Sequence, residues 1–275
     1  MKINLVDSNF SHHPNNSVAY KQHSKFIEWY RGGELVSNTV FFTDLHLKDV
    51  TRVKHAKRKV AWLLEPRAIN PGIYDWIEQN NKLFDYVLTF DKQLLDRGAN
   101  FIFYPFGVTW VDGGSNKSYE KTKMVSIIGS NKSMTPGHEF RRQVIHHCMQ
   151  RGDVDVFGRG YNEIANKEEG LADYRFSIVM ENSQADWYFS EKLIDCFVTE
   201  TIPIYWGCDI TKCFNGDGVL KFQTIDDLDA VLNTINSKLY EDSWNNILIN
   251  KATVINSSLD VPENWIFKHY PFLFE

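Results

Sequence analysis

Short runs of β-branched and aromatic residues alternate along this chain with longer segments of helical period, a pattern typical of parallel sheets covered by helices. The strands expected in the first half are Lys2–Asp7, Thr39–Asp44, Lys59–Glu65, Tyr86–Phe90 and Phe101–Pro105. The helices expected between them lie near Val18–Tyr30, Leu45–Arg58, Ile73–Phe84 and Lys92–Arg97. The alternation therefore predicts an α/β fold.

Between Trp110 and Lys123 the sequence becomes polar, contains glycine and loses its periodicity, which predicts a linker between two domains. A second α/β series follows, with strands expected at Met124–Gly129, Val154–Gly158, Phe176–Met180, Ile202–Trp206 and Val219–Gln223. Its expected helices are Glu139–Gln150, Tyr188–Thr199 and Leu228–Leu239, followed by a helical tail from Tyr240. We expect two Rossmann-like domains, residues 1–115 and residues 116–275.

Charge and composition exclude several classes of protein. The 30 Lys and Arg against 35 Asp and Glu give a net charge of −5, so no overall positive field attracts nucleic acid. The longest apolar runs fall far short of the roughly 18 residues that span a bilayer, and the first residues lack the apolar core of a secretory signal. The 4 cysteines form no CxxC pair and no zinc spacing, which favours free thiols, although Cys208 and Cys213 are close enough in sequence to pair. We expect a cytoplasmic protein without an integral membrane segment.

Carboxylates stand at the ends of two predicted strands. Glu65 comes directly before Pro66, and Glu181 and Asn182 follow the Phe176–Met180 strand. In open α/β sheets, ligands bind beyond the carboxyl ends of the strands. These side chains are therefore expected to face one another across a cleft between the domains.

The most specific signal is a series of three short motifs between Met180 and Gly207. They are Met-Glu-Asn-Ser-Gln from Met180, Tyr-Phe-Ser-Glu-Lys-Leu from Tyr188, and Ile-Pro-Ile-Tyr-Trp-Gly from Ile202. This series resembles the donor-binding motif of the α-1,3/1,4-fucosyltransferase family (glycosyltransferase family 10 type), and the resemblance extends to Val154–Gly158. It implies a GT-B-like fold, two Rossmann-like domains facing across a cleft, with the acceptor on the side of residues 1–115 and the nucleotide-sugar donor on residues 116–275.

The expected donor-binding residues are Arg141, Glu181, Asn182, Tyr188, Glu191 and Lys192. A departing nucleoside diphosphate develops negative charge, which fixed cations can stabilise in place of a metal ion. Lys192, in the first turns of a helix, adds an ammonium group to the positive end of the helix dipole. Register with the family selects Arg141 rather than Arg142 as the guanidinium that grips the diphosphate. Glu191 suits the ribose hydroxyls; the ordinary alternative for the Glu191-Lys192 pair is a solvated helix face.

Lys59–Pro66 resembles the strand that delivers the catalytic carboxylate in that family. Glu65 would take the proton of the acceptor hydroxyl while that oxygen attacks the anomeric carbon, giving inversion in one displacement. Partial burial beside Trp62 would raise the pKa of Glu65. The alternative is an ordinary glutamate at a strand end.

Two further signals are weaker. Asp153-Val154-Asp155 has the form of the metal-binding DxD motif, but it leads into a predicted strand, so we expect a structural role and no metal cofactor. His12 and His13 would lie on the acceptor side of the cleft or in a surface loop.

Taken with the resemblance, these residues predict a metal-independent inverting glycosyltransferase that moves fucose from GDP-fucose to a glycan hydroxyl. Its expected partners are the nucleotide-sugar donor and the glycan acceptor. A transferase for another nucleotide sugar is one alternative, because Arg141 and Lys192 would hold any diphosphate. A catalytically silent glycan- or nucleotide-binding protein is the other; the presence of Glu65 together with both cations argues against it.

Overall fold

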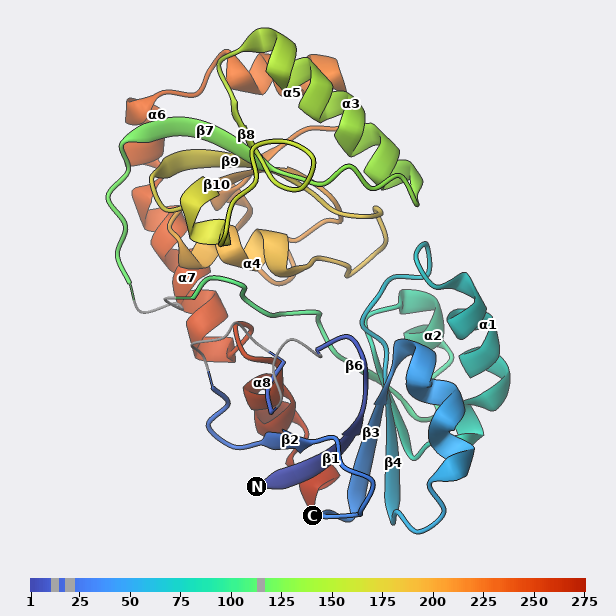
Figure 1. The fold of residues 1–275 in the computed structure, drawn as a ribbon. Coiled ribbons are helices and arrows are strands. Elements are labelled where there is room, and N and C mark those ends of the chain that lie inside the picture. Colours follow the sequence, from blue (N-terminus) through green and yellow to red (C-terminus); the bar gives the residue numbers. More distant parts are fainter. Residues whose placement is uncertain (11–14, 18–22, 113–116) are drawn as a thin grey trace.

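The computed structural model describes residues 1–10, 15–17, 23–112 and 117–275, and its two sheets lie one above the other in Figure 1. The first sheet has the strand order β2-β1-β3-β4-β5-β6 and the second has the order β11-β10-β9-β7-β8. All paired neighbours in both sheets run parallel. Two parallel sheets with helices packed against them confirm the predicted α/β class.

The first sheet consists of β1 (Lys2–Val6), β2 (Glu28–Tyr30), β3 (Thr39–Thr43), β4 (Arg58–Trp62), β5 (Tyr86–Thr89) and β6 (Phe101–Phe103). Its helices are the 3-10 helix η1 (Asp44–Arg52), α1 (Pro71–Asn80), the 3-10 helix η2 (Asn81–Leu83) and α2 (Lys92–Asp96). Phe41, Phe42 and Val60 are completely buried, because β3 and β4 are central strands that pack on both faces of the sheet.

Two helix predictions in this domain are wrong. The helix expected at Val18–Tyr30 contains strand β2 over Glu28–Tyr30, while residues 18–22 lie outside the described residues. Trp29 explains the change: it is buried and packs edge-on against Phe41, with ring centroids 5.2 Å apart, so the aromatic side chain suits the pleated surface of a strand. The helix expected at Leu45–Arg58 is a 3-10 helix that ends at Arg52.

The second sheet consists of β7 (Lys123–Ile128), β8 (Asp155–Phe157), β9 (Tyr174–Met180), β10 (Ile202–Trp206) and β11 (Leu220–Lys221). Its helices are α3 (Pro136–Arg151), η4 (Lys167–Gly170), α4 (Glu191–Val198), η5 (Gly216–Gly218), α5 (Ile225–Leu232) and α6 (Ser237–Asp242). The single helix expected at Leu228–Leu239 is therefore divided into α5 and α6. Asn236 caps α6 by accepting a hydrogen bond from Leu239 N at 2.9 Å, which accounts for the new start.

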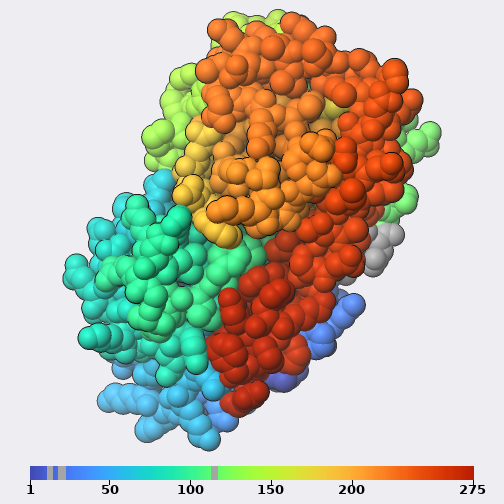
Figure 2. Space-filling view, turned by 180° about the vertical axis from the view of Figure 1, so that it is seen from behind, coloured from blue at the N-terminus to red at the C-terminus, as the bar shows by residue number. Residues whose placement is uncertain are grey.

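The helical tail returns to the first domain. α7 (Trp244–Ser257) leads away from the second sheet to α8 (Pro262–His269) and η6 (Pro271–Phe274), and in Figure 2 this red segment packs beside the blue and teal residues of the first domain. Leu273 shares a core with Ile3, and its carbonyl accepts a hydrogen bond from Thr39 Oγ1 at 2.6 Å. The predicted boundary between residues 115 and 116 lies outside the described residues and stays a prediction.

Two further observations concern membrane-spanning helices and the cysteines. Among the described residues, no helix is both long and apolar enough to cross a membrane. Cys148, Cys196, Cys208 and Cys213 are all free thiols, so Cys208 and Cys213 form no disulfide.

Candidate active site

A cavity of about 460 Å³ lies between the two domains, beyond the carboxyl ends of β4 and β9. The first domain and the start of the linker contribute Asn9, Phe10, Leu64, Glu65, Phe106 and Trp110 to its lining. The second domain contributes, among others, Lys132, His138, Arg141, Asn182, Tyr188, Glu191 and Lys192. The cavity thus brings together all but one of the residues predicted to form the site.

The exception is Glu181, which lies behind the cavity wall and is completely buried. Its two carboxylate oxygens accept hydrogen bonds from Ser190 N at 2.8 Å and from Ser190 Oγ at 2.6 Å. Glu181 therefore fixes the residue that precedes α4. Its Oε2 also lies 3.6 Å from Lys192 Nζ, so any contribution of this glutamate to donor binding is indirect and passes through the positions of α4 and of that lysine.

Ser190 also explains why α4 begins later than predicted. Its side chain accepts a hydrogen bond from Lys192 N at 3.4 Å, which makes Ser190 the N-cap and Glu191 the first helical residue. The expected start at Tyr188 is wrong by one helical turn. With this start, Glu191 and Lys192 occupy the first turn, where backbone N–H groups point toward a ligand.

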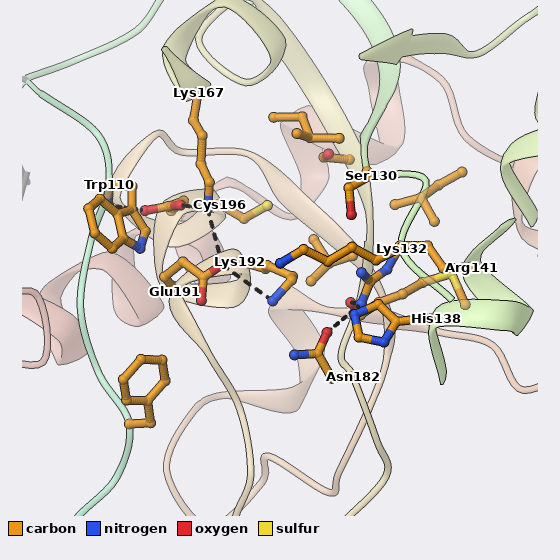
Figure 3. Close-up of a pocket in the computed structure, with 18 of the residues that line it drawn as sticks. Trp110, Ser130, Lys132, His138, Arg141, Lys167, Asn182, Glu191, Lys192 and Cys196 are labelled. Carbon is orange, nitrogen blue, oxygen red and sulfur yellow. Dashed lines mark hydrogen bonds and ion pairs between the residues drawn. The ribbon is translucent and has the colours of Figure 1, made fainter. Parts of the chain in front are cut away.

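Glu191 lies between two ammonium groups. Its Oε1 is 3.3 Å from Lys192 Nζ and 3.3 Å from Lys167 Nζ (Figure 3). Burial by itself would raise the pKa of Glu191, but the two ammonium groups outweigh it and hold the pKa well below its usual range. Glu191 is therefore a carboxylate throughout the neutral range and accepts hydrogen bonds only.

Lys167 lines the same cavity, but no sequence motif predicted it as a site residue. It lies on η4, and its Nζ is 2.7 Å from Oδ2 of Asp195, a completely buried residue of α4. The other oxygen of Asp195 accepts hydrogen bonds from Thr109 Oγ1 and Trp110 N, both at 2.8 Å. Although burial opposes the charge on Lys167, the carboxylates of Asp195 and Glu191 raise its pKa and keep it protonated. Lys167 thus joins η4 to α4, and Asp195 joins α4 to the start of the linker.

Arg141 reaches the cavity from α3. It is 5% exposed, and its Nη2 donates to Met180 O at 2.6 Å and to Asn182 Oδ1 at 3.1 Å. Burial lowers the pKa of Arg141, but a guanidinium remains charged at neutral pH. Arg142, in contrast, is exposed and pairs with Glu139 at 3.1 Å on the outer face of the helix.

Lys132 and the imidazole of His138 also line this side of the cavity, and neither was predicted from the sequence. His138 is buried at the start of α3, with Nδ1 2.8 Å from Thr135 Oγ1, and burial lowers its pKa to about 4. The imidazole is therefore neutral at physiological pH and can both donate and accept a hydrogen bond. In Figure 3, Lys132 extends toward the same space as Lys192 and Arg141. A ligand in this space meets three positive charges on one side.

Glu65 faces these groups from the first domain. Its carboxylate has no hydrogen-bond partner among the described residues, whereas its backbone carbonyl accepts a hydrogen bond from Tyr74 Oη at 2.9 Å. Burial raises the pKa of Glu65, and the nearby charge of Lys192 opposes this effect. The carboxylate is therefore open to a ligand and more basic than an exposed glutamate.

Tyr188 lies where the two domains meet. It is buried, and its ring packs against Phe90 of the first domain with centroids 5.1 Å apart. Burial raises its pKa well above the usual value, so the phenol keeps its proton. Tyr188 can therefore donate a hydrogen bond into the cavity that it lines.

The two aspartates of the Asp153-Val154-Asp155 motif do not line the cavity. Asp153 pairs with Arg151 at 2.8 Å, and Asp155 accepts a hydrogen bond from Tyr174 Oη at 2.7 Å. His12 and His13 lie outside the described residues. Within the described ranges, no group of three or more His, Cys, Asp or Glu side chains could hold a metal ion.

Comparisons with known proteins agree with this geometry. Residues 118–245 match the family model described as glycosyltransferase family 10 (fucosyltransferase) C-term. The chain is similar to the alpha-(1,3)-fucosyltransferase FucT of Helicobacter pylori, with 38% identity over 77 residues. That alignment covers 28% of this chain and only 16% of the relative.

Solved structures resemble the whole chain. An alpha1,3-fucosyltransferase solved with GDP matches with a TM-score of 0.60 and 20% identity, covering 99% of this chain and 88% of the other. TarM matches with a TM-score of 0.55 and 11% identity, covering 87% of this chain and 55% of the other. Likenesses at such low identity bear on the fold, and they confirm the predicted GT-B-like class. The family match confirms the resemblance that the sequence motifs indicated.

Proposed function

We propose that this chain is a fucosyltransferase that moves fucose from GDP-fucose to a hydroxyl group of a glycan acceptor, in agreement with the match of residues 118–245 to the model of glycosyltransferase family 10. The observation that carries the proposal is the opposition of charges across one cavity. Arg141, Lys132 and Lys192 approach it from the second domain, and the unpartnered carboxylate of Glu65 approaches it from the first. An anion bound on one side would thus leave its attached group facing a base on the other.

The cationic side suits a diphosphate. As the bond between the anomeric carbon and the phosphate oxygen breaks, negative charge grows on the diphosphate, and prearranged cations stabilise it without reorganisation. Arg141 is already oriented by Met180 O and Asn182 Oδ1, so little side-chain entropy is lost when it binds a phosphate. Lys192 adds its ammonium group to the N-terminal N–H groups of α4. This arrangement accounts for leaving-group departure without a metal ion.

The opposite side suits proton transfer. The acceptor oxygen attacks the anomeric carbon from the face opposite the diphosphate, the bond to the leaving oxygen breaks, and Glu65 takes the hydroxyl proton. A single displacement of this kind inverts the configuration. The raised pKa of Glu65 makes its carboxylate a better base, and the charge of Lys192, which opposes the rise, favours the ionised form.

The donor side is expected to recognise the nucleotide through Glu191. A carboxylate held between Lys167 and Lys192 can accept hydrogen bonds from both ribose hydroxyls. The choice of nucleotide is supported by similar alpha1,3-fucosyltransferases whose structures were solved with GDP and with GDP-fucose. Under this proposal the sugar lies between the diphosphate cations and Glu65.

A panel of nucleotide sugars tests the proposal. GDP-fucose and GDP should raise the unfolding temperature, because a ligand at 100 times its dissociation constant stabilises the fold by roughly 2.7 kcal/mol, whereas UDP-glucose should not. GDP-mannose is the close control, since it shares the whole nucleotide and isolates the contribution of the sugar. Slow hydrolysis of GDP-fucose, followed by release of GDP, should accompany binding.

Each alternative predicts a different outcome of the same panel. Equal stabilisation by UDP-glucose would indicate that the donor is a nucleotide sugar other than GDP-fucose. Binding of GDP with neither sugar transfer nor hydrolysis would favour a silent binding protein and refute the proposed activity.

A further inference from the structure

Asp44 follows directly after β3, and its side chain contacts the backbone of Glu65, the proposed base. It is 2% exposed, and its backbone has a positive φ of 36°, which a residue other than glycine seldom adopts. A backbone conformation of this kind costs of order 1–3 kcal/mol and persists where the surroundings enforce it. At Asp44 the chain turns away from β4 into η1 and leaves the end of β4 without its neighbouring strand.

The side chain of Asp44 accepts the hydrogen bonds of backbone N–H groups that a neighbouring strand would otherwise accept. Its Oδ1 accepts a hydrogen bond from Leu64 N at 2.9 Å, and its Oδ2 accepts one from Glu65 N at 3.3 Å. A third donor, Asn9 Nδ2, is 2.7 Å from Oδ2. The Asp44 carboxylate therefore accepts hydrogen bonds from the backbone N–H groups of both Leu64 and Glu65. The next residue, Pro66, has no N–H group.

The protonation state of Asp44 matters because all of its partners are donors. An ionised carboxylate accepts every one of these hydrogen bonds, whereas a protonated one has an O–H donor that faces another donor. Asp44 has no ion-pair partner within the described part of the chain, so nothing but these three hydrogen bonds offsets the cost of burying its charge. Burial, helped by the negative charge of Glu65 and opposed by the three hydrogen bonds, raises the pKa of Asp44 to about 7.

We infer that Asp44 is a positioning residue for Glu65: its ionised carboxylate holds the backbone of Leu64 and Glu65, and productive proton transfer requires that form. The inference deepens the proposed function and rests on Glu65 as its base. Asp44 itself does not line the cavity, so it acts through the main chain of Glu65 rather than on substrate.

The pH dependence follows from the sign of this shift. A carboxyl group with a raised pKa becomes protonated as the pH falls through that value, here near 7, so the backbone of Glu65 loses the support of an ionised Asp44 below that pH. The titratable side chains on the elements around Asp44 are Glu65 after β4, Tyr74 on α1, Asp7 after β1 and Asp91 after β5. Tyr74 stays neutral because burial raises its pKa well above the usual value. The negative charge of Glu65 opposes ionisation of Asp44.

A double-mutant cycle tests the positioning role. Asp44→Asn keeps the shape of the side chain and one acceptor oxygen but loses the charge. Because a misplacement of about 1 Å costs about 100-fold in rate, we expect kcat to fall by roughly 10- to 100-fold, while KM for GDP-fucose changes less than about twofold. In a Glu65→Gln background the same substitution should change the residual rate less than about twofold, since the base it positions is gone. An equal loss in both backgrounds, or an unchanged kcat, would overturn the inference.

Asp49→Asn is the matched control. Asp49 lies on the same 3-10 helix and pairs with His46 and Arg52 outside the cavity, so its substitution should leave kcat and the pH profile unchanged. If Asp44→Asn does not fold, Asn9→Ala offers a second variant. Loss of the Asn9 donor should raise the pKa of Asp44 and move the acid limb of kcat to higher pH. An acid limb that does not move would contradict the inference.

A measurement without turnover separates this inference from the proposed function. In NMR spectra, the amide protons of Leu64 and Glu65 should shift with a midpoint near the pKa of about 7 of Asp44, and the shift should vanish in Asp44→Asn. Amides that do not titrate would refute the role of Asp44 even in an active enzyme. If the amides titrate as expected and the protein transfers no fucose, the proposed function fails and the contact of Asp44 with the Glu65 backbone stands.

Discussion

Replacing Arg141 with alanine is expected to weaken the binding of GDP while leaving the binding of guanosine nearly unchanged. One guanidinium nitrogen, Nη2, contacts Met180 O and Asn182 Oδ1. The other two nitrogens have no hydrogen-bond partner among the described residues, and the side chain lines the cavity. They are therefore the donors available to a phosphate, and the base of the nucleotide does not depend on them.

The size of the effect follows from these contacts. A hydrogen bond to a charged group contributes about 1.5–3 kcal/mol, so losing one or two of them on the diphosphate should cost about 2–4 kcal/mol. This is about 30- to 900-fold in the dissociation constant of GDP. The variant also leaves Met180 O without its side-chain donor, which is expected to lower the free energy of unfolding by about 1–3 kcal/mol.

Titration calorimetry with GDP and with guanosine measures the two affinities, at a temperature well below unfolding. Arg142→Ala is the control, because Arg142 lies on the same helix but is exposed and pairs only with Glu139, so GDP should bind it within about twofold of the original affinity. Normal GDP affinity in a folded Arg141→Ala protein would refute the assignment. So would a loss of guanosine binding as large as the loss of GDP binding, which would indicate general disruption of the site.

Three further results are expected. Glu65→Ala should lower turnover by about 10²- to 10⁴-fold with GDP binding preserved; normal turnover would remove Glu65 from the mechanism, and loss of GDP binding would make its role structural. Transfer should persist in excess EDTA because fixed cations meet the leaving group; activity that disappears and returns with Mn²⁺ would contradict this and make 153–155 the first segment to test. Lys167→Met should lower the free energy of unfolding by about 2–3 kcal/mol at neutral pH, and by less at acid pH, where the buried Asp195 can take a proton. Lys117→Met breaks only an exposed pair, so thermal unfolding from about pH 5 to about pH 8 should show neither the loss of stability nor its pH dependence.

The sequence was most informative where a local pattern coincides with a rule of topology. The apolar runs that form β4 and β9 are visible without any structure, and parallel sheets place ligands beyond the carboxyl ends of their strands. This reasoning brought Glu65 and Asn182 to one cleft from positions more than a hundred residues apart, and both line the cavity. The motif after β9 added Glu191 and Lys192 in the first turn of α4.

The wrong predictions concern segments whose structure depends on contacts with other parts of the chain. Glu28–Tyr30 lacks the length of a typical strand, and it becomes β2 only because β1 offers a free edge and Trp29 a buried aromatic surface. Glu181 stands in the donor motif, yet it is turned inward by Ser190, which belongs to the same motif. A motif identifies which residues matter, but not which of them touch a ligand.

Lys167 shows why the chemistry of the motif is incomplete without its surroundings. Glu191 and Lys192 are adjacent in sequence, and a carboxylate next to a diphosphate would repel it across the low-dielectric cavity. The repulsion is offset because the ammonium group of Lys167 lies 3.3 Å from Glu191 Oε1, while Asp195 balances the remaining charge of that lysine from inside the domain. The ammonium group of Lys192 contacts Ser190 Oγ at 2.9 Å, Glu191 Oε1 at 3.3 Å and Glu181 Oε2 at 3.6 Å, which hold it at the cavity wall. Lys167, which lies 24 residues before Glu191 on a 3-10 helix with no signature of its own, thus offsets the negative charge that Glu191 would present to the leaving group.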